Sequence, residues 1–145
     1  MARVSTYLNF KRETEAAFEF YRSVFGGEFI GPVHRMGDAP QMPGQPPLAE
    51  ADRRLVMHVE LAILGGHVLM GTDSPDSMCR PLHFGDNVHI NLEPDTRAET
   101  DRLFAALSEG AQVHMPLQPM FWGGYFGSLT DRWGVCWMFN CAAAA

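Results

Sequence analysis

The chain has 145 residues, 46% of them hydrophobic, and a formal net charge of −6 at pH 7. This length suits one domain with an apolar core, and the composition excludes a disordered chain. Lys11 is the only lysine and the arginines are scattered, so no basic stripe could neutralise phosphates, and we expect no nucleic-acid partner.

The start of the chain and its cysteines predict a cytoplasmic protein. Residues 1–7 lead directly into a strand-like pattern and lack the apolar core of a signal peptide. No apolar run approaches membrane-spanning length, so we expect no membrane partner. Cys79, Cys136 and Cys141 are odd in number and form no Cys-x-x-Cys pair, which indicates reduced thiols.

The chain opens with a strand followed by a helix. Residues 4–10 alternate in polarity as a strand does, with Tyr7 and Asn9 on one face. A helix is expected from about Thr14, a favoured N-cap residue, to Phe25, where a pair of glycines can end it.

Three further strands complete the first half. A short strand is expected over residues 28–33, and residues 36–53 form a loop rich in proline and glycine. Strands over residues 55–64 and 67–71 flank Gly65-Gly66, a pair that tight hairpin turns favour.

The same order then starts again. Residues 88–92 alternate as a strand, and Thr96 with Glu99 forms a capping box that begins a helix ending near Gly110. A turn at Asp131 joins the last two strands. The strands expected after the helix cover residues 113–115, 125–130 and 135–139.

The repeated order predicts an α+β fold made of two βαβββ modules. Module one covers about residues 1–80 and module two about residues 86–141, within a single domain of residues 1–145. Each module gives a curved mixed sheet with a helix on its outer face. The bare inner faces need a partner, so we expect the two sheets to enclose a cleft.

Three stretches resemble PhnB-like proteins of the glyoxalase/bleomycin-resistance, or vicinal oxygen chelate, superfamily. They are Tyr7-Leu-Asn-Phe10, Glu15 to Tyr21, and the C-terminal run Phe121 to Asn140 with its aromatic pair, glycines, Thr-Asp and Trp-Met. Some PhnB-like proteins are described as demethylubiquinone methyltransferases. The sequence has no glycine-rich strand-turn-helix of the S-adenosylmethionine type, so we do not expect methyl transfer.

The resemblance also implies where a metal would bind. Enzymes of the superfamily hold a divalent metal with His, Gln or Glu ligands, among them a Glu in the last strand. His89 fits a family ligand position, whereas residues 135–138 contain no carboxylate. His58 and Glu60 lie two apart on one strand and could join His89 in a substitute set of two histidines and one carboxylate.

The sequence leaves three functions open. The first is binding of a small organic ligand in the inter-sheet cleft, without a cofactor. The second is a divalent-metal-dependent lyase, isomerase or dioxygenase that uses His58, Glu60 and His89. The third is a structural or regulatory protein without a ligand, and in each case we expect a homodimer. The cleft residues that we expect are Tyr7, Asn9, His58, Glu60, His89, Asn91, Phe121, Trp122 and Tyr125.

Overall fold

The structure, a computed structural model, describes residues 1–78 and 80–142. It separates into two compact units, Met1–Leu82 and His83–Ala145. Cys79 and residues 143–145 lie outside the described residues. Cys136 and Cys141 are buried free thiols, as the sequence predicts. In the described part of the chain, no helix is long and apolar enough to cross a membrane.

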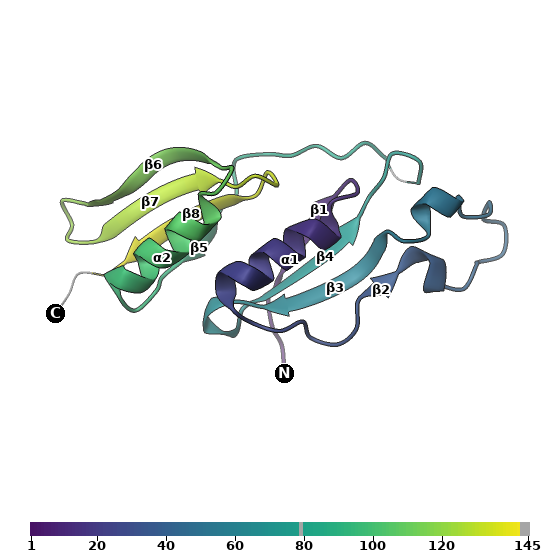
Figure 1. The fold of residues 1–145 in the computed structure, drawn as a ribbon, viewed down its shortest axis with the longest axis horizontal. Coiled ribbons are helices and arrows are strands. Elements are labelled where there is room, and N and C mark those ends of the chain that lie inside the picture. Colours follow the sequence, from purple (N-terminus) through teal and green to yellow (C-terminus); the bar gives the residue numbers. More distant parts are fainter. Residues whose placement is uncertain (79, 143–145) are drawn as a thin grey trace. The chain divides into compact units, whose positions relative to one another are not determined.

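The first unit is a four-stranded mixed sheet with one long helix against it (Figure 1). Its strand order is β1-β4-β3-β2, with β1 parallel to β4 and the other neighbours antiparallel. The elements are β1 (Thr6–Phe10), α1 (Thr14–Phe25), β2 (His34–Arg35), β3 (Val56–Ala62) and β4 (Val68–Asp73). Short 3-10 turns, η1 to η3, cover Met36–Asp38, Glu50–Asp52 and Leu64–Gly66.

Helix α1 forms over the predicted residues, and it ends at Gly26 in the left-handed conformation. Its start differs from our expectation. Thr14 is the first helical residue rather than the N-cap, and the preceding Glu13 makes no side-chain cap bond. The Thr14 N–H instead donates to the Asp73 carboxylate at 3.0 Å. A residue distant in sequence therefore accepts from an N–H group that has no partner within the first turn of the helix. The local sequence pattern had predicted an N-cap side chain for this role.

The prediction of a strand over residues 28–33 is wrong. Phe29 makes one isolated bridge to Leu61, and the edge strand β2 begins only at His34. Pro32 has no N–H to donate to a neighbouring strand, and Gly31 takes a φ of 73°. The chain therefore turns here before it pairs with β3.

The glycine pair between β3 and β4 forms the expected turn. Gly65 and Gly66 have φ values of 67° and 78°, which favour glycine. The Ile63 N–H donates to the His67 carbonyl at 2.8 Å and closes the loop. The hairpin is thus correct, although β3 ends at Ala62 instead of residue 64, and β4 begins one residue later than predicted and continues to Asp73.

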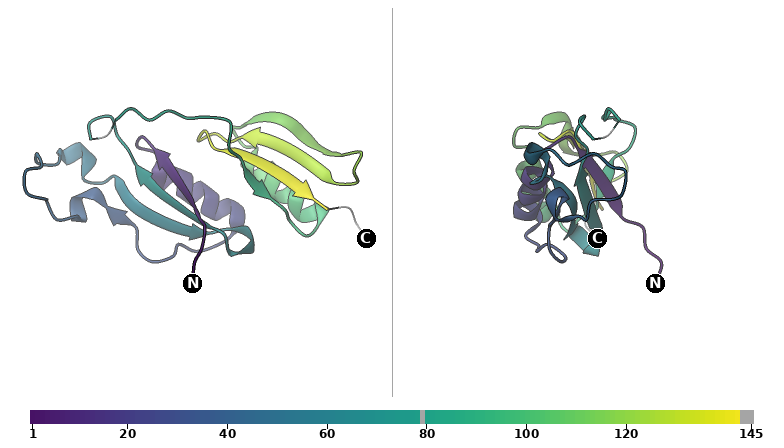
Figure 2. Two further views of the ribbon diagram at one scale, coloured as in Figure 1. Left: turned by 180° about the vertical axis from the view of Figure 1, so that it is seen from behind. Right: turned by 90° about the vertical axis from the view of Figure 1, so that its right-hand side faces the viewer.

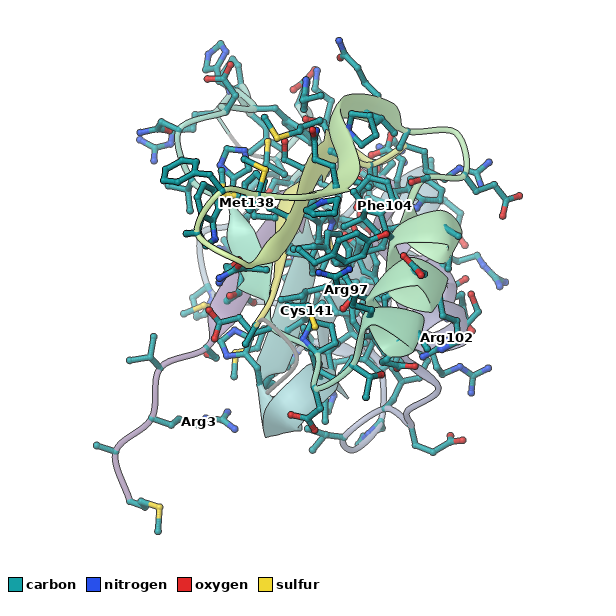
Figure 3. All side chains as sticks on the ribbon, turned by 90° about the vertical axis from the view of Figure 1, so that its left-hand side faces the viewer. Arg3, Arg97, Arg102, Phe104, Met138 and Cys141 are labelled. Carbon is teal, nitrogen blue, oxygen red and sulfur yellow. The ribbon has the colours of Figure 1, made fainter. Side chains whose placement is uncertain are left out.

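The second unit repeats this architecture, with strand order β5-β8-β7-β6 and β5 parallel to β8. The Thr96 hydroxyl caps α2 by accepting from the Glu99 N–H at 3.2 Å, as the sequence predicts. Phe104 of α2, which Figure 3 labels, packs edge-on against Phe139 with 5.1 Å between the ring centroids. The elements are β5 (Ile90–Leu92), α2 (Arg97–Leu107), β6 (Gln112–Pro119), β7 (Tyr125–Thr130) and β8 (Cys136–Cys141).

Two boundaries in this unit differ from the prediction. Strand β5 begins at Ile90 rather than at residue 88, so Val88 and His89 precede it, and Val88 is 75% exposed. Strand β6 is longer than the three residues expected, because its pairing with β7 continues across two irregularities in register. The fold as a whole is the predicted α+β arrangement of two mixed sheets with a helix on each.

Candidate functional site

One face of the first sheet is left uncovered by α1 (Figure 2, left). Phe18 of α1 lies against Gly71, where an added Cβ would come within 2.8 Å of the Phe18 Cζ. Strand alternation therefore turns the neighbours of Gly71 to the opposite face. There Tyr7 of β1, Met70 of β4 and Glu60 of β3 stand side by side in register.

A chain of hydrogen bonds joins three of the predicted site residues on this face. The Tyr7 hydroxyl lies 3.2 Å from His58 Nδ1, and His58 Nε2 lies 3.0 Å from Glu60 Oε1. The Tyr7 and His58 rings are tilted by 44° at 5.8 Å between centroids. Tyr7 is 48% exposed, while the His58 and Glu60 side chains are 30% and 22% exposed. All three can thus be reached from solvent.

The surroundings shift the pKa values of two members of the cluster. The hydrogen bond from His58 is the main cause that lowers the pKa of Glu60, so this carboxyl is charged at neutral pH. Burial, followed by the nearby Glu60 charge, raises the pKa of Tyr7, so the phenol stays neutral. A charged carboxylate only accepts hydrogen bonds, so His58 Nε2 carries the proton that is shared with Glu60.

Two further residues border this cluster. Asn9 is exposed at the end of β1, and its side-chain oxygen accepts from the Ser74 hydroxyl at 3.4 Å. Arg3, which sequence reasoning missed, places Nη2 3.6 Å from Glu60 Oε2. Nothing in the sequence pattern indicates this contact, because it joins residues 57 positions apart across the sheet.

The predicted polar residues of the second unit lie around β5. Asn91 pairs in register with Met138, is exposed, and donates to Glu93 Oε1 at 3.1 Å. Leu92 and its partner Phe139 are buried on the side of α2, so alternation turns Asn91 to the opposite face. His89 is half-buried just ahead of the strand.

The aromatic pair of the second unit is exposed. Phe121 is 97% exposed and Trp122 is 53% exposed, and their rings meet edge-on at 5.0 Å. Trp122 also meets Phe126 at 6.3 Å and lies beside Gly124, where an added Cβ would come within 3.0 Å of its Cδ1. Sequence reasoning missed Phe126, although its place next to Tyr125 in an alternating strand puts the two on opposite faces.

Tyr125 corrects our expectation. Its hydroxyl donates to Asp101 at 2.7 Å, and the Arg97 guanidinium lies 4.8 Å from its ring centre. Both partners belong to α2, on which Figure 3 labels Arg97. Tyr125 therefore lies on the helix-covered face and not on the open one. The register of β7 with β8, in which Tyr125 pairs with Cys141, sets the face on which Tyr125 lies. The aromatic composition of the segment did not predict this face.

The described residues contain no group of three or more His, Cys, Asp or Glu side chains arranged to hold a metal ion. His58 and Glu60 lie together, but their facing atoms are hydrogen-bonded to each other. A hollow of about 90 Å³ lies on the α1 side of the first sheet. Phe18, Phe29, Val56 and Val59 line it together with charged residues, and it contains none of the predicted site residues.

The duplicated βαβββ order with parallel first and last strands defines the glyoxalase/bleomycin-resistance fold. A glyoxylase/bleomycin resistance protein/dioxygenase domain from Frankia sp. EAN1pec shares it with a TM-score of 0.63 at 14% identity, over 100% of this chain and 95% of that one. Within this class, the chain belongs to the PhnB-like family described as 3-demethylubiquinone-9 3-methyltransferase, whose sequence model matches residues 2–139.

Two solved relatives are more similar. Protein PA1353 from Pseudomonas aeruginosa is 35% identical with a TM-score of 0.83, over 99% of this chain and 100% of that one. A putative 3-demethylubiquinone-9 3-methyltransferase, PhnB protein, from Bacillus cereus is 25% identical with a TM-score of 0.76, over 97% and 100%. The resemblance to PhnB-like proteins is confirmed.

Proposed function

We propose that this protein binds a small organic molecule on the uncovered face of its first sheet, at Tyr7, Asn9, His58 and Glu60. The observation that carries the proposal is the hydrogen-bonded chain from Tyr7 through His58 to Glu60. Partners at both ring nitrogens fix the orientation of the imidazole, so polar groups are positioned before a ligand arrives. Preorganisation of this kind reduces the entropy cost of binding.

The second unit also exposes surface of its own that suits an organic molecule. Phe121 and Trp122 are exposed, and flat aromatic side chains of this kind suit the rings or chains of organic ligands. Asn91 adds an exposed amide on the face opposite α2.

The family description names a methyltransferase, but we propose binding without methyl transfer. The sequence carries no glycine-rich strand-turn-helix of the S-adenosylmethionine type. S-adenosylmethionine added to the protein in a calorimeter is expected to give no heat of binding. Stoichiometric binding of that cofactor would contradict this part of the proposal.

A fragment screen by ligand-observed NMR tests the binding function. Wild-type protein is expected to bind some of the fragments, and His58→Ala is expected to lose those that contact the cluster, because the chain of hydrogen bonds is broken. His83→Ala, a change at an exposed histidine of the second unit, is the matched control and should retain binding. Equal binding by both variants would remove the first sheet as the site.

Titration with Zn²⁺ and Mn²⁺ tests the metal-dependent alternative. The observation that favours it is that His58 and Glu60 share one face of β3; a metal would have to replace the hydrogen bond between His58 Nε2 and Glu60 Oε1. Stoichiometric metal uptake that is lost in both His58→Ala and His89→Ala would support the alternative and the set of His58, Glu60 and His89. Uptake that survives both changes would exclude these ligands.

We also propose that the chain forms a homodimer. Val88, Phe121 and Trp122 leave apolar surface of the second unit in contact with water, and association with a second copy would bury it. Light scattering at micromolar concentration is expected to give twice the chain mass. A monomer mass under these conditions would contradict the proposal.

A further inference from the structure

Arg3 lies on the segment that precedes β1 (Figure 3). Its guanidinium contacts the Glu60 carboxylate. Its Nη2 lies 3.6 Å from Oε2, and the Arg3 side chain is 55% exposed. This separation is too long for a good hydrogen bond, and an ion pair this exposed is weak. Glu60 Oε1 is already occupied by His58, so Oε2 is the oxygen that Arg3 holds only loosely.

The direction of the hydrogen bonds makes the cluster a surface of acceptors. His58 Nε2 donates to Glu60, and in a neutral imidazole Nδ1 is then the acceptor for the Tyr7 hydroxyl. With the imidazole in this neutral form, the Tyr7 hydroxyl uses its only proton in the hydrogen bond to His58, so its oxygen accepts from a ligand. Tyr7 Oη and Glu60 Oε2 together therefore favour a partner that carries N–H or O–H donors.

The charges favour a cationic partner. Glu60 is ionised and Tyr7 is a neutral phenol, in agreement with the directions of their pKa shifts. The exposed Tyr7 ring can also attract a cation to its face. The guanidinium of Arg3 is the group that the chain itself places at this position.

We propose that the Tyr7–His58–Glu60 cluster binds a small organic cation with N–H donors, such as an amine, amidine or guanidinium, and that Arg3 competes with it for Glu60. This inference rests on the ligand-binding function proposed above and names its ligand class. The cation donates to Glu60 Oε2 and Tyr7 Oη, while His58 holds both residues in place.

Three probes of nearly equal shape test the charge requirement by calorimetry: benzamidine, benzamide and benzoate. Benzamidine is expected to bind at least about tenfold more tightly than neutral benzamide, because hydrogen bonds to a charged group are the stronger ones. Benzoate is expected not to bind. A preference for benzamide or benzoate would overturn the proposal.

Variants test the named residues. Glu60→Gln should weaken benzamidine binding about tenfold, whereas Glu109→Gln, at an exposed glutamate of the second unit, should leave it unchanged. Arg3→Ala should tighten it about two- to fivefold, and Arg54→Ala is the matched control at another exposed arginine of the first unit. Unchanged affinity in both Glu60→Gln and Arg3→Ala would overturn the proposal.

These experiments distinguish the cation preference from the ligand-binding function on which it rests. Neutral or anionic fragments that bind and are lost in His58→Ala would leave the ligand-binding function standing and overturn the cation preference. Circular dichroism of Glu60→Gln shows whether its fold is retained. If that variant does not fold, the Arg3→Ala affinity decides the proposal by itself.

Discussion

The indole nitrogen of Trp137 donates a 2.8 Å hydrogen bond to the carboxylate of Asp131, and both residues are buried. The other carboxylate oxygen accepts from the N–H groups of Trp133 and Val135 at 2.8 and 3.0 Å. Asp131 is thus the turn residue that the sequence predicts. It also joins the β7–β8 turn to the largest side chain of the second core.

Asp131→Ala is expected to lower the free energy of unfolding by about 2–4 kcal/mol, because three donors lose their acceptor and the indole is buried. Urea unfolding followed by tryptophan fluorescence measures the change. Asp86→Ala, at an exposed residue of the same unit, should change stability by less than about 0.5 kcal/mol. A loss for Asp131→Ala as small as that of the control would refute the role given to this carboxylate.

Gly71→Ala should destabilise the first unit by about 1–3 kcal/mol through overpacking. The new Cβ would come within 2.8 Å of the Phe18 Cζ and 3.0 Å of the Thr14 Cγ2, so α1 would have to move off the sheet. Thermal unfolding measures the effect. Gly85→Ala meets its nearest atom at 3.5 Å and serves as the control. Equal melting temperatures for the two variants would show that the approach of α1 is not as close as described.

The Asp52 carboxylate predicts acid sensitivity of the loop over residues 36–53. Its two oxygens accept from Arg12 at 2.8 Å and from the Ser77 hydroxyl at 2.9 Å. The Arg12 hydrogen bond, followed by that of Ser77, lowers the pKa of Asp52 below its ordinary value of 3.8. The unfolded chain therefore binds this proton more readily, so the stabilisation is present above pH 3.8 and is lost as the pH falls through the folded-state pKa.

Asp52→Asn should accordingly unfold more easily than wild type at neutral pH, with the difference shrinking as the pH is lowered below 3.8. Urea unfolding over a pH series measures it, and limited proteolysis of the loop provides a local readout. Asp38→Asn, at an exposed carboxylate of the same loop, is the control. A difference that does not vary with pH would contradict the assignment.

The pKa of the Tyr125 phenol should depend on the contacts of this side chain with α2. The hydrogen bond to Asp101 is the main cause that raises the pKa of Tyr125, burial and the Asp101 charge add to it, and Arg97 opposes it. Asp101→Asn is expected to lower this pKa toward the ordinary tyrosine value, and Arg97→Ala to raise it. Ring carbon NMR of labelled tyrosine follows the titration, with Asp95→Asn as the control. If Asp101→Asn leaves the pKa unchanged, Tyr125 does not lie against α2 as described.

The local sequence pattern predicts most helices and strands of this fold, and the face of the strand on which some side chains lie. The stripe of α1, the Thr96 cap of α2 and the glycine pair before His67 are correct because each depends on neighbours a few residues apart. The edge strand β2 and the first residue of α1 were mispredicted. Both depend on partners far along the chain: β2 pairs with Val56 and His58 of β3, and the Thr14 N–H donates to Asp73.

The amino-acid sequence by itself determined the duplicated strand-helix-strand order and the polar alternation that turns Tyr7, His58 and Glu60 to one side. Alternation follows from backbone geometry within each strand, so it can be read without coordinates. Only the tertiary structure decided that these side chains form one hydrogen-bonded chain, that Arg3 reaches Glu60, and that Tyr125 meets α2. Strand register and side-chain distances set these contacts, and neither is encoded in local spacing.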